Sequence, residues 1–153
     1  MDVLDLFSRT FLPLAAQAGI PIPTLSRHMP LFRRYADPND PTMLVTRCAR
    51  ADRPLARPYL LLLTRRHLVV TTESRVLHRP RLHLEARVSA LQGVTWQADP
   101  SHHSVELAVT TARARERFWI KALHPRQLWR YEAALGYVFR ESLETTVSPV
   151  GAF

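Results

Sequence analysis

The sequence predicts a mainly β domain of the α+β class, in which a bent antiparallel sandwich or barrel of seven strands is closed by a C-terminal helix. Three observations lead to this class. Apolar residues alternate in short runs from residue 42 to residue 122, as they do in antiparallel sheets. From residue 125 the spacing becomes helical. The 153 residues are 46% hydrophobic and 22% charged, which fits one globular domain and excludes a disordered chain.

Residues 2–18 are expected to form a short amphipathic helix that starts with Asp2 as its N-cap and stops at Gly19. Pro13 has no N–H to donate, so it predicts a kink or an earlier end. The apolar residues of this helix, at three- and four-residue spacing, are Leu4, Phe7, Phe11 and Leu14. Two interpretations stay open, because this face can pack on the protein's own domain or insert into a groove of another protein.

The next segment, residues 19–41, contains five prolines and predicts an extended arm. The breaker sequence Asp-Pro-Asn-Asp-Pro ends it. We therefore expect three regions: the N-terminal helix and proline-rich arm in residues 1–41, the main domain in residues 42–144, and a flexible tail in residues 145–153.

Seven strands are expected in the main domain, and they cover residues 43–50, 59–64, 67–72, 76–84, 88–97, 105–111 and 115–122. Pro80 lies inside the fourth and predicts an edge strand, where a missing N–H breaks no ladder. A helix follows, and Pro125 suits its first turn. Its apolar stripe is Leu128, Tyr131, Leu135, Val138 and Ser142, with Phe139 beside it.

The positive charge is concentrated in the middle of the chain. Of the 21 cationic residues only Lys121 is lysine, and residues 42–122 hold 14 cations against six acids, which accounts for the whole net charge of +8. Such a segment attracts anionic partners. Codon usage in a GC-rich genome is the alternative explanation for the preference for arginine over lysine.

Two local sequences resemble bacterial members of the pleckstrin-homology-like (PH-like) superfamily. Residues 61–70, Leu-Leu-Leu-Thr-Arg-Arg-His-Leu-Val-Val, resemble a second strand, basic turn and third strand. Residues 115–120, which lead into residues 124–129, resemble the last strand and the closing helix. The resemblance implies a non-catalytic scaffold that binds phosphoinositides, peptides or proteins, with the helix plugging one end of the bent sheet. It covers residues 42–144 and leaves the first 41 unexplained.

Phosphoinositide binding is not expected, because this chain departs from the basic pattern of the lipid-binding members. The matching region has no lysine and is interrupted by Asp52, Pro54 and Pro58. The arginines there form the first candidate site for an anion or a partner, with a solvated loop as the alternative: Arg47, Arg50, Arg53 and Arg57.

The last strand and the turn before it form the second candidate site. If Phe118 and Ile120 point inward, a basic face with one tryptophan points outward. This face could stack a base or anchor a protein, unless the N-terminal arm or an arginine stem covers the ring. Its residues are Arg113, Arg115, Arg117, Trp119 and Lys121.

No motif in the sequence predicts catalysis, a cofactor or a metal. Cys48 is the single cysteine, and no elbow or glycine-rich phosphate loop accompanies it. His102 and His103 are adjacent in a loop without a matching cluster of other ligands. The acidic N-terminus does not resemble a signal peptide, so the cytoplasm is the expected compartment.

The expected function is that of a non-catalytic adaptor, which docks on a larger protein assembly through the N-terminal helix and an arginine-rich surface. Two alternatives remain at this point. One is an accessory factor of a transcription or replication machine that associates with nucleic acid. The other is a peripheral membrane protein that binds anionic lipid.

Overall fold

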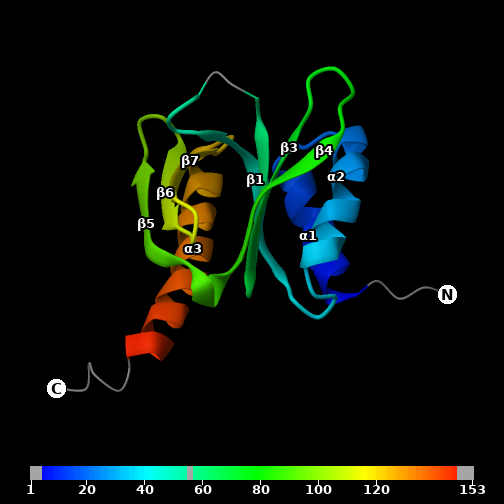
Figure 1. Cartoon of the computed structure of the whole chain (residues 1–153). Helices are drawn as coiled ribbons and strands as arrows, with labels where there is room; N and C mark the ends of the chain where they lie inside the picture. Colours follow the sequence, from blue (N-terminus) through cyan, green and yellow to red (C-terminus); the bar gives the residue numbers. More distant parts are fainter. Residues whose placement is uncertain (1–4, 55–56, 148–153) are drawn as a thin grey trace.

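The computed structural model describes residues 5–54 and 57–147, with side chains of the last helix described up to residue 140 (Figure 1). The helices are α1 (Leu6–Gln17), α2 (Ile22–Tyr35) and α3 (Pro125–Val147), with a short 3-10 turn η1 (Val88–Ala90). The strands are β1 (Thr42–Arg50), β2 (Tyr59–Thr64), β3 (His67–Glu73), β4 (Pro80–Arg87), β5 (Gln92–Asp99), β6 (Ser104–Thr110) and β7 (Arg115–Lys121).

All seven strands form one antiparallel sheet in the order β4-β3-β2-β1-β7-β6-β5, which confirms the predicted class. The first strand joins two halves of this sheet. It pairs with β2 from Thr42 to Cys48, but with β7 only from Cys48 to Arg50. Figure 1 shows β1 passing between the β2–β4 half and the β5–β7 half.

The larger apolar core lies inside the bent sheet, where α3 packs against both halves. Four residues of the expected helical stripe are buried there, and Phe139 beside them is 2% exposed. Those four residues are Leu128, Tyr131, Leu135 and Val138. Ser142 lies outside the described side chains. The helix continues to Val147, so residues 145–147 are helical rather than the start of a tail.

A second apolar core lies on the outer face of β1, β2 and β3, where α1 and α2 pack. The second strand therefore has apolar cover on both faces. Leu60 and Leu62 contact the helices, whereas Leu61 and Leu63 belong to the inner core. This double cover explains why the strand has a continuous apolar sequence instead of an alternating one.

The N-cap of the first helix lies three residues later than the expected Asp2. Asp5 is the N-cap, and its Oδ1 accepts a hydrogen bond from the backbone N–H of Ser8 at 2.7 Å. Pro13 does not end the helix, which continues to Gln17. The apolar side chains buried on either side of the proline, Phe11 and Ala15, pack on the sheet and compensate for the lost backbone bond.

The expectation of an extended arm in residues 19–41 is wrong, because residues 22–35 form helix α2. Its first two prolines occupy the N-cap and the first turn, where no intrahelical N–H bond is required. The buried His28 and Phe32 attach the helix to the sheet, so Pro30 is tolerated inside it. The sequence prediction counted the prolines without considering their positions.

Two strand boundaries also differ from the prediction. The fourth strand starts at Pro80, and Val76 and Leu77 lie in the preceding turn. The expected strand at residues 88–97 divides into η1 and β5. The edge position predicted from Pro80 is confirmed, because β4 lies at one end of the sheet and Pro80 is its first residue. No helix in the described part of the chain is long and apolar enough to cross a membrane.

Candidate binding site on the open sheet face

The outer face of the β5–β7 half is open to solvent, in contrast to the face that α1 and α2 cover. On β7, Phe118 and Ile120 are fully buried, as predicted. The four residues that alternate with them are exposed together on the outer face, and they are Arg115, Arg117, Trp119 and Lys121. The condition stated for this strand, that Phe118 and Ile120 point inward, is therefore met, and Trp119 is 41% exposed.

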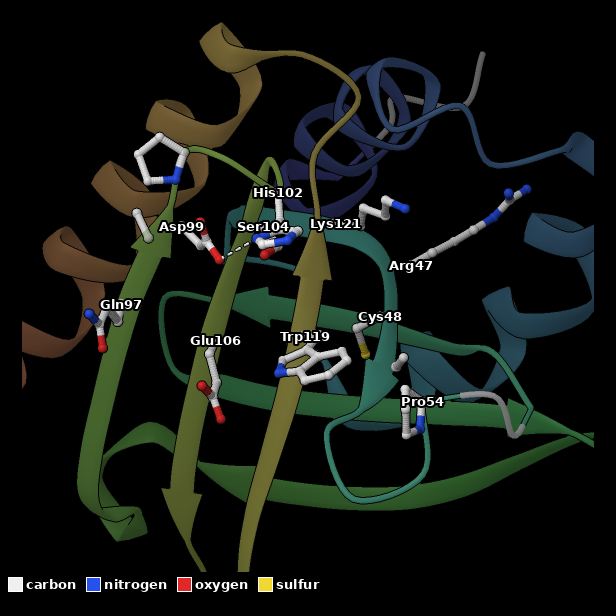
Figure 2. A pocket seen from close by; sticks show the side chains of 13 residues that line it. Arg47, Cys48, Pro54, Gln97, Asp99, His102, Ser104, Glu106, Trp119 and Lys121 are labelled. Atoms are coloured by element: carbon white, nitrogen blue, oxygen red, sulfur yellow. Dashed lines mark hydrogen bonds and ion pairs between the residues drawn. The ribbon is translucent and has the colours of Figure 1, made fainter.

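Trp119 lies in a cross-strand row with one acidic and one small neighbour. It pairs with Glu106 on β6 and with Ala49 on β1. The small side chain of Ala49 and the turn residue Pro54 leave space beside the indole ring. A hollow of about 900 Å³ results, and Figure 2 shows Trp119 standing at its centre.

Two of the exposed arginines already have partners on this face. The Nε of Arg117 lies 3.3 Å from Glu106 Oε1. Arg115 donates to the carbonyl oxygen of Gly93 at 2.9 Å, and to Thr110 Oγ1 at the same distance. Gly93 has a φ of 55° and lies where the β5–β6 register shifts between Gln92 and Thr95. Arg115 therefore stabilises an irregular segment of the edge strand β5. These two side chains stabilise the sheet.

The cations at one end of the hollow differ from these two. Lys121 and Arg47 both line the hollow, and neither forms an ion pair with a residue that the structure describes. In Figure 2 both side chains point away from Trp119 toward the same side of the view. Two charged donors therefore remain free to meet an anionic group of a ligand.

The β5–β6 turn forms another side of the hollow and is shaped by Asp99. Its Oδ1 accepts from Ser101 Oγ at 2.6 Å, and its Oδ2 lies 2.7 Å from His102 Nδ1. The hydrogen bond from Ser101 has the largest effect on the pKa of Asp99, and both hydrogen bonds lower it. No group of three or more His, Cys, Asp or Glu side chains that could hold a metal ion occurs among the described residues.

The structure does not gather the four arginines of the loop candidate into one pocket. Only Arg47 lines the hollow. Arg50 is paired with Asp52 at 3.0 Å, while Arg53 and Arg57 are exposed loop residues. In the second candidate set, Arg113 lies in the β6–β7 turn and does not line the hollow.

The apolar face of the N-terminal helix is covered by the protein's own sheet. Phe7 and Phe11 are 1% and 0% exposed, and Leu14 packs partly buried against the same cluster. Leu4 lies outside the described residues. This is the self-docked arrangement of the two that the sequence left open, so the face is not free to receive a partner. The segment also does not cover Trp119, because α1 and α2 pack on the other half of the sheet.

Sequence reasoning missed Ala49, Pro54 and Glu106 as parts of the site. Their proximity to Trp119 depends on the β1–β7 and β6–β7 registers, which a single sequence does not specify. Cys48, beneath the hollow, is 5% exposed, and burial strongly raises the pKa of its thiol. A protonated, buried thiol is a poor nucleophile.

No family model matches this chain, and neither does any curated protein sequence. Among solved structures, the DH/PH domains of p115-RhoGEF, as a point mutant, match it with a TM-score of 0.51 at 10% identity. The match covers 88% of this chain and 39% of that chain. The fold is PH-like. At this identity the likeness is evidence for the fold alone.

A second crystal structure, of N-terminally truncated linker-DH/PH domains of p115-RhoGEF, matches with a TM-score of 0.46 at 12% identity. It covers 92% of this chain and 38% of that chain. The TM-score of 0.51 with the first of these structures, together with the seven-stranded antiparallel sheet, confirms the PH-like fold expected from the sequence. The more specific resemblance to bacterial members stays a prediction.

Proposed function

We propose that this PH-like chain is a non-catalytic binding domain that docks on a partner protein through the open sheet face around Trp119. The observation that carries the proposal is the large exposed ring, which stands in a hollow of about 900 Å³ with Arg47 and Lys121 at one end. Tryptophan and arginine are among the residue types that contribute most to protein interfaces.

The charges of the hollow favour a partner segment with an acidic side chain. Arg117 is engaged by Glu106, whereas Arg47 and Lys121 have no ion-pair partner among the described residues. An apolar side chain of the partner would enter beside Trp119 and Ala49, and a carboxylate would meet the two free cations. Docking of this kind needs no covalent chemistry, and the buried Cys48 supplies no reactive thiolate.

The experiment compares variants of the tagged protein in pull-downs from the cytosol of its own source, followed by affinity measurement with the partner recovered. Trp119→Ala is expected to weaken binding by at least about thirtyfold, the effect of losing an interface residue worth about 2 kcal/mol. The double variant Arg47→Gln with Lys121→Gln is also expected to bind the partner more weakly than the parent protein. This loss of affinity should be larger at low salt than at moderate salt. Arg113→Gln, which removes an exposed arginine outside the hollow, is the matched control and should change affinity less than about twofold.

Nuclease treatment separates this proposal from the nucleic-acid alternative. A protein partner that persists after nuclease and is lost with Trp119→Ala supports docking on the open face. A partner list that vanishes with nuclease, or binding that falls steeply with salt and ignores Trp119, contradicts it and favours phosphate contacts. Binding by all variants equal to that of the parent protein would also reject the open face as the interface.

A second candidate function, contact with an anionic membrane, is favoured by the tip of the β3–β4 hairpin. Val76 and Leu77 are 86% and 64% exposed, and Arg75 and Arg79 flank them. The turn is ordered, because the Ser74 N–H donates to the Arg79 carbonyl oxygen at 3.0 Å. An apolar tip with adjacent arginines combines the two signals that peripheral membrane binding requires.

This candidate predicts binding to phosphatidylcholine vesicles only when an anionic lipid such as phosphatidylglycerol is added. Each arginine near such a surface contributes about 1 kcal/mol, so Arg75→Gln with Arg79→Gln should weaken vesicle binding roughly thirtyfold. Val76→Ser with Leu77→Ser should also weaken it, whereas Trp119→Ala should not. Flotation that is indifferent to anionic lipid would reject the membrane candidate and leave the open-face proposal unaffected.

A further inference from the structure

The outer face of α3 carries two large aromatic side chains that the fold does not use. Trp129 and Tyr137 are 52% and 50% exposed, and the exposed Ala133 lies midway between them. Their spacing of four residues places all three in one row along the helix. Neither ring has a hydrogen bond or a ring contact with any residue that the structure describes.

The residues around this row are cationic. Arg126, Arg130 and Arg140 are exposed on the same side of α3. The one acidic residue of the described helix side chains, Glu132, is turned toward the sheet, where its Oε1 accepts from Trp96 Nε1 at 3.3 Å. Arg140 lies over the Trp96 ring at 5.7 Å, and its Nη2 lies 3.8 Å from Glu132 Oε1. Arg130 has one exposed hydrogen bond, of 3.4 Å to Gln17 Oε1, so Arg126 and Arg130 are the cations most available to a partner.

The composition of this face is that of an interface centre. Aromatic residues and arginine are enriched at protein interfaces, whereas lysine, glutamate and aspartate are depleted there. The row also has a suitable shape. Trp129 and Tyr137 are eight positions apart, which is about 12 Å along the helix. The small Ala133 leaves a notch between the two rings into which a side chain of a second helix can pack.

A second copy of this chain is disfavoured as the occupant. A two-fold contact between two α3 helices centred on Ala133 would bring Arg126 of one copy close to Arg140 of the other if the helices were antiparallel. In a parallel contact, Arg126 and Arg130 would lie close to the same residues of the other copy. Like charges in such a contact oppose association, and both copies carry a net charge of +8. Charge complementarity instead requires an acidic partner.

We propose that the row Trp129, Ala133 and Tyr137, with Arg126 and Arg130 beside it, binds an acidic amphipathic helix of another protein. This surface is separate from the hollow around Trp119, because none of its residues lines that hollow. The two surfaces can therefore be tested independently. A domain with both would hold two partner segments at once, which is how an adaptor links components.

The test uses the full chain and a synthetic helical peptide of about 18 residues, or roughly five turns. One version has leucines on one face and glutamates elsewhere, and the control version replaces every glutamate by lysine. Binding is measured by fluorescence anisotropy of the labelled peptide. The acidic version is expected to bind at least about tenfold tighter than the basic one, and Trp129→Ala with Tyr137→Ala to weaken it at least about thirtyfold.

Three further measurements decide the outcome. Arg126→Gln with Arg130→Gln should weaken binding of the acidic peptide. It should lower the free energy of unfolding by less than about 0.5 kcal/mol, because both side chains are exposed and only the 3.4 Å hydrogen bond from Arg130 to Gln17 is lost. Trp119→Ala should bind the peptide as the parent protein does. Equal binding of the acidic and basic peptides, or no effect of the aromatic substitutions, overturns the proposal. If sedimentation shows concentration-dependent dimers of the parent protein, and Trp129→Ala abolishes them, the proposal is overturned. The row would then bind a second copy of this chain instead of an acidic helix.

Discussion

Replacing Phe11 by alanine is expected to lower the free energy of unfolding by about 3–5 kcal/mol, the usual cost of emptying a buried phenylalanine site. Phe11 is 0% exposed, and its ring centroid lies 5.3 Å from that of Phe7 and 5.8 Å from that of Phe32. It therefore joins α1 to α2 above the sheet. Urea unfolding followed by circular dichroism measures the change.

The control for this substitution is the next residue of the same helix. Leu12 is 44% exposed, so Leu12→Ala should shift the unfolding free energy by less than about 0.5 kcal/mol. If Phe11→Ala were as stable as the parent protein, the two N-terminal helices would be dispensable to the fold. Their loss would expose Leu60, Leu62 and Val69, which are now buried beneath them.

Acidification below pH 6.5 is expected to destabilise the protein through His28, which is 1% exposed between α2 and the sheet. Its Nδ1 lies 2.8 Å from Thr71 Oγ1, and its Nε2 lies 2.9 Å from Glu73 Oε1. Burial lowers the pKa of His28 below 6.5, although the carboxylate of Glu73 opposes part of this effect. The unfolded chain therefore binds the proton first. The free energy of unfolding therefore falls as the pH drops from 6.5 to the pKa of His28 in the folded protein. The loss is about 1.4 kcal/mol for each pH unit by which folding lowers this pKa.

Glu73 adds a separate loss at lower pH. Burial acts to raise its pKa, but hydrogen bonds and charges from Arg27 and His28 outweigh burial and lower the pKa below 4.5. Its contribution is complete above pH 4.5 and is lost as the pH falls through the lowered pKa. His78 also faces this carboxylate, with its Nδ1 3.6 Å from Glu73 Oε2.

The experiment is urea unfolding at a series of pH values between 7.5 and 4.5, and the quantity compared is the urea concentration at the midpoint of unfolding. His28→Gln keeps an amide that can bond both neighbours but cannot be protonated, so its profile should be flatter than that of the parent protein. His102→Gln removes an exposed histidine that is paired with Asp99 at the surface, so it should alter the pH dependence much less than His28→Gln does. If the urea midpoint of His28→Gln fell with pH as steeply as that of the parent protein, the acid sensitivity would not come from this buried side chain.

The N-terminal helices influence the candidate function by the surface they leave open. A bent sheet has two outer halves, and α1 and α2 cover the half formed by β1, β2 and β3. The other half keeps its polar, arginine-bearing face in water, with Trp119 exposed in it. The part of the chain first considered as a docking arm is thus a structural cover, and the open half becomes the proposed interface.

Some of the site followed from the sequence, because strand alternation is a local property. The burial of Phe118 and Ile120 and the exposure of Trp119 and Lys121 all follow from a period of two. The position of Ala49 does not, since it depends on which strand lies beside β7 and in what register. The ion pair of Arg117 with Glu106, and the lack of one for Lys121 among the described residues, likewise depend on neighbours from other strands.

The sequence by itself determined the number of strands, their antiparallel type, the closing helix and the position of the excess charge. These features depend on local periodicity, on proline positions and on composition, which a single chain carries in full. Only the tertiary structure decided that residues 22–35 form a helix, that Phe7 and Phe11 are covered, and that the arginines of the loop stay apart. The physical reason is that packing partners and cross-strand registers come from distant segments, and burial against them can override local propensity.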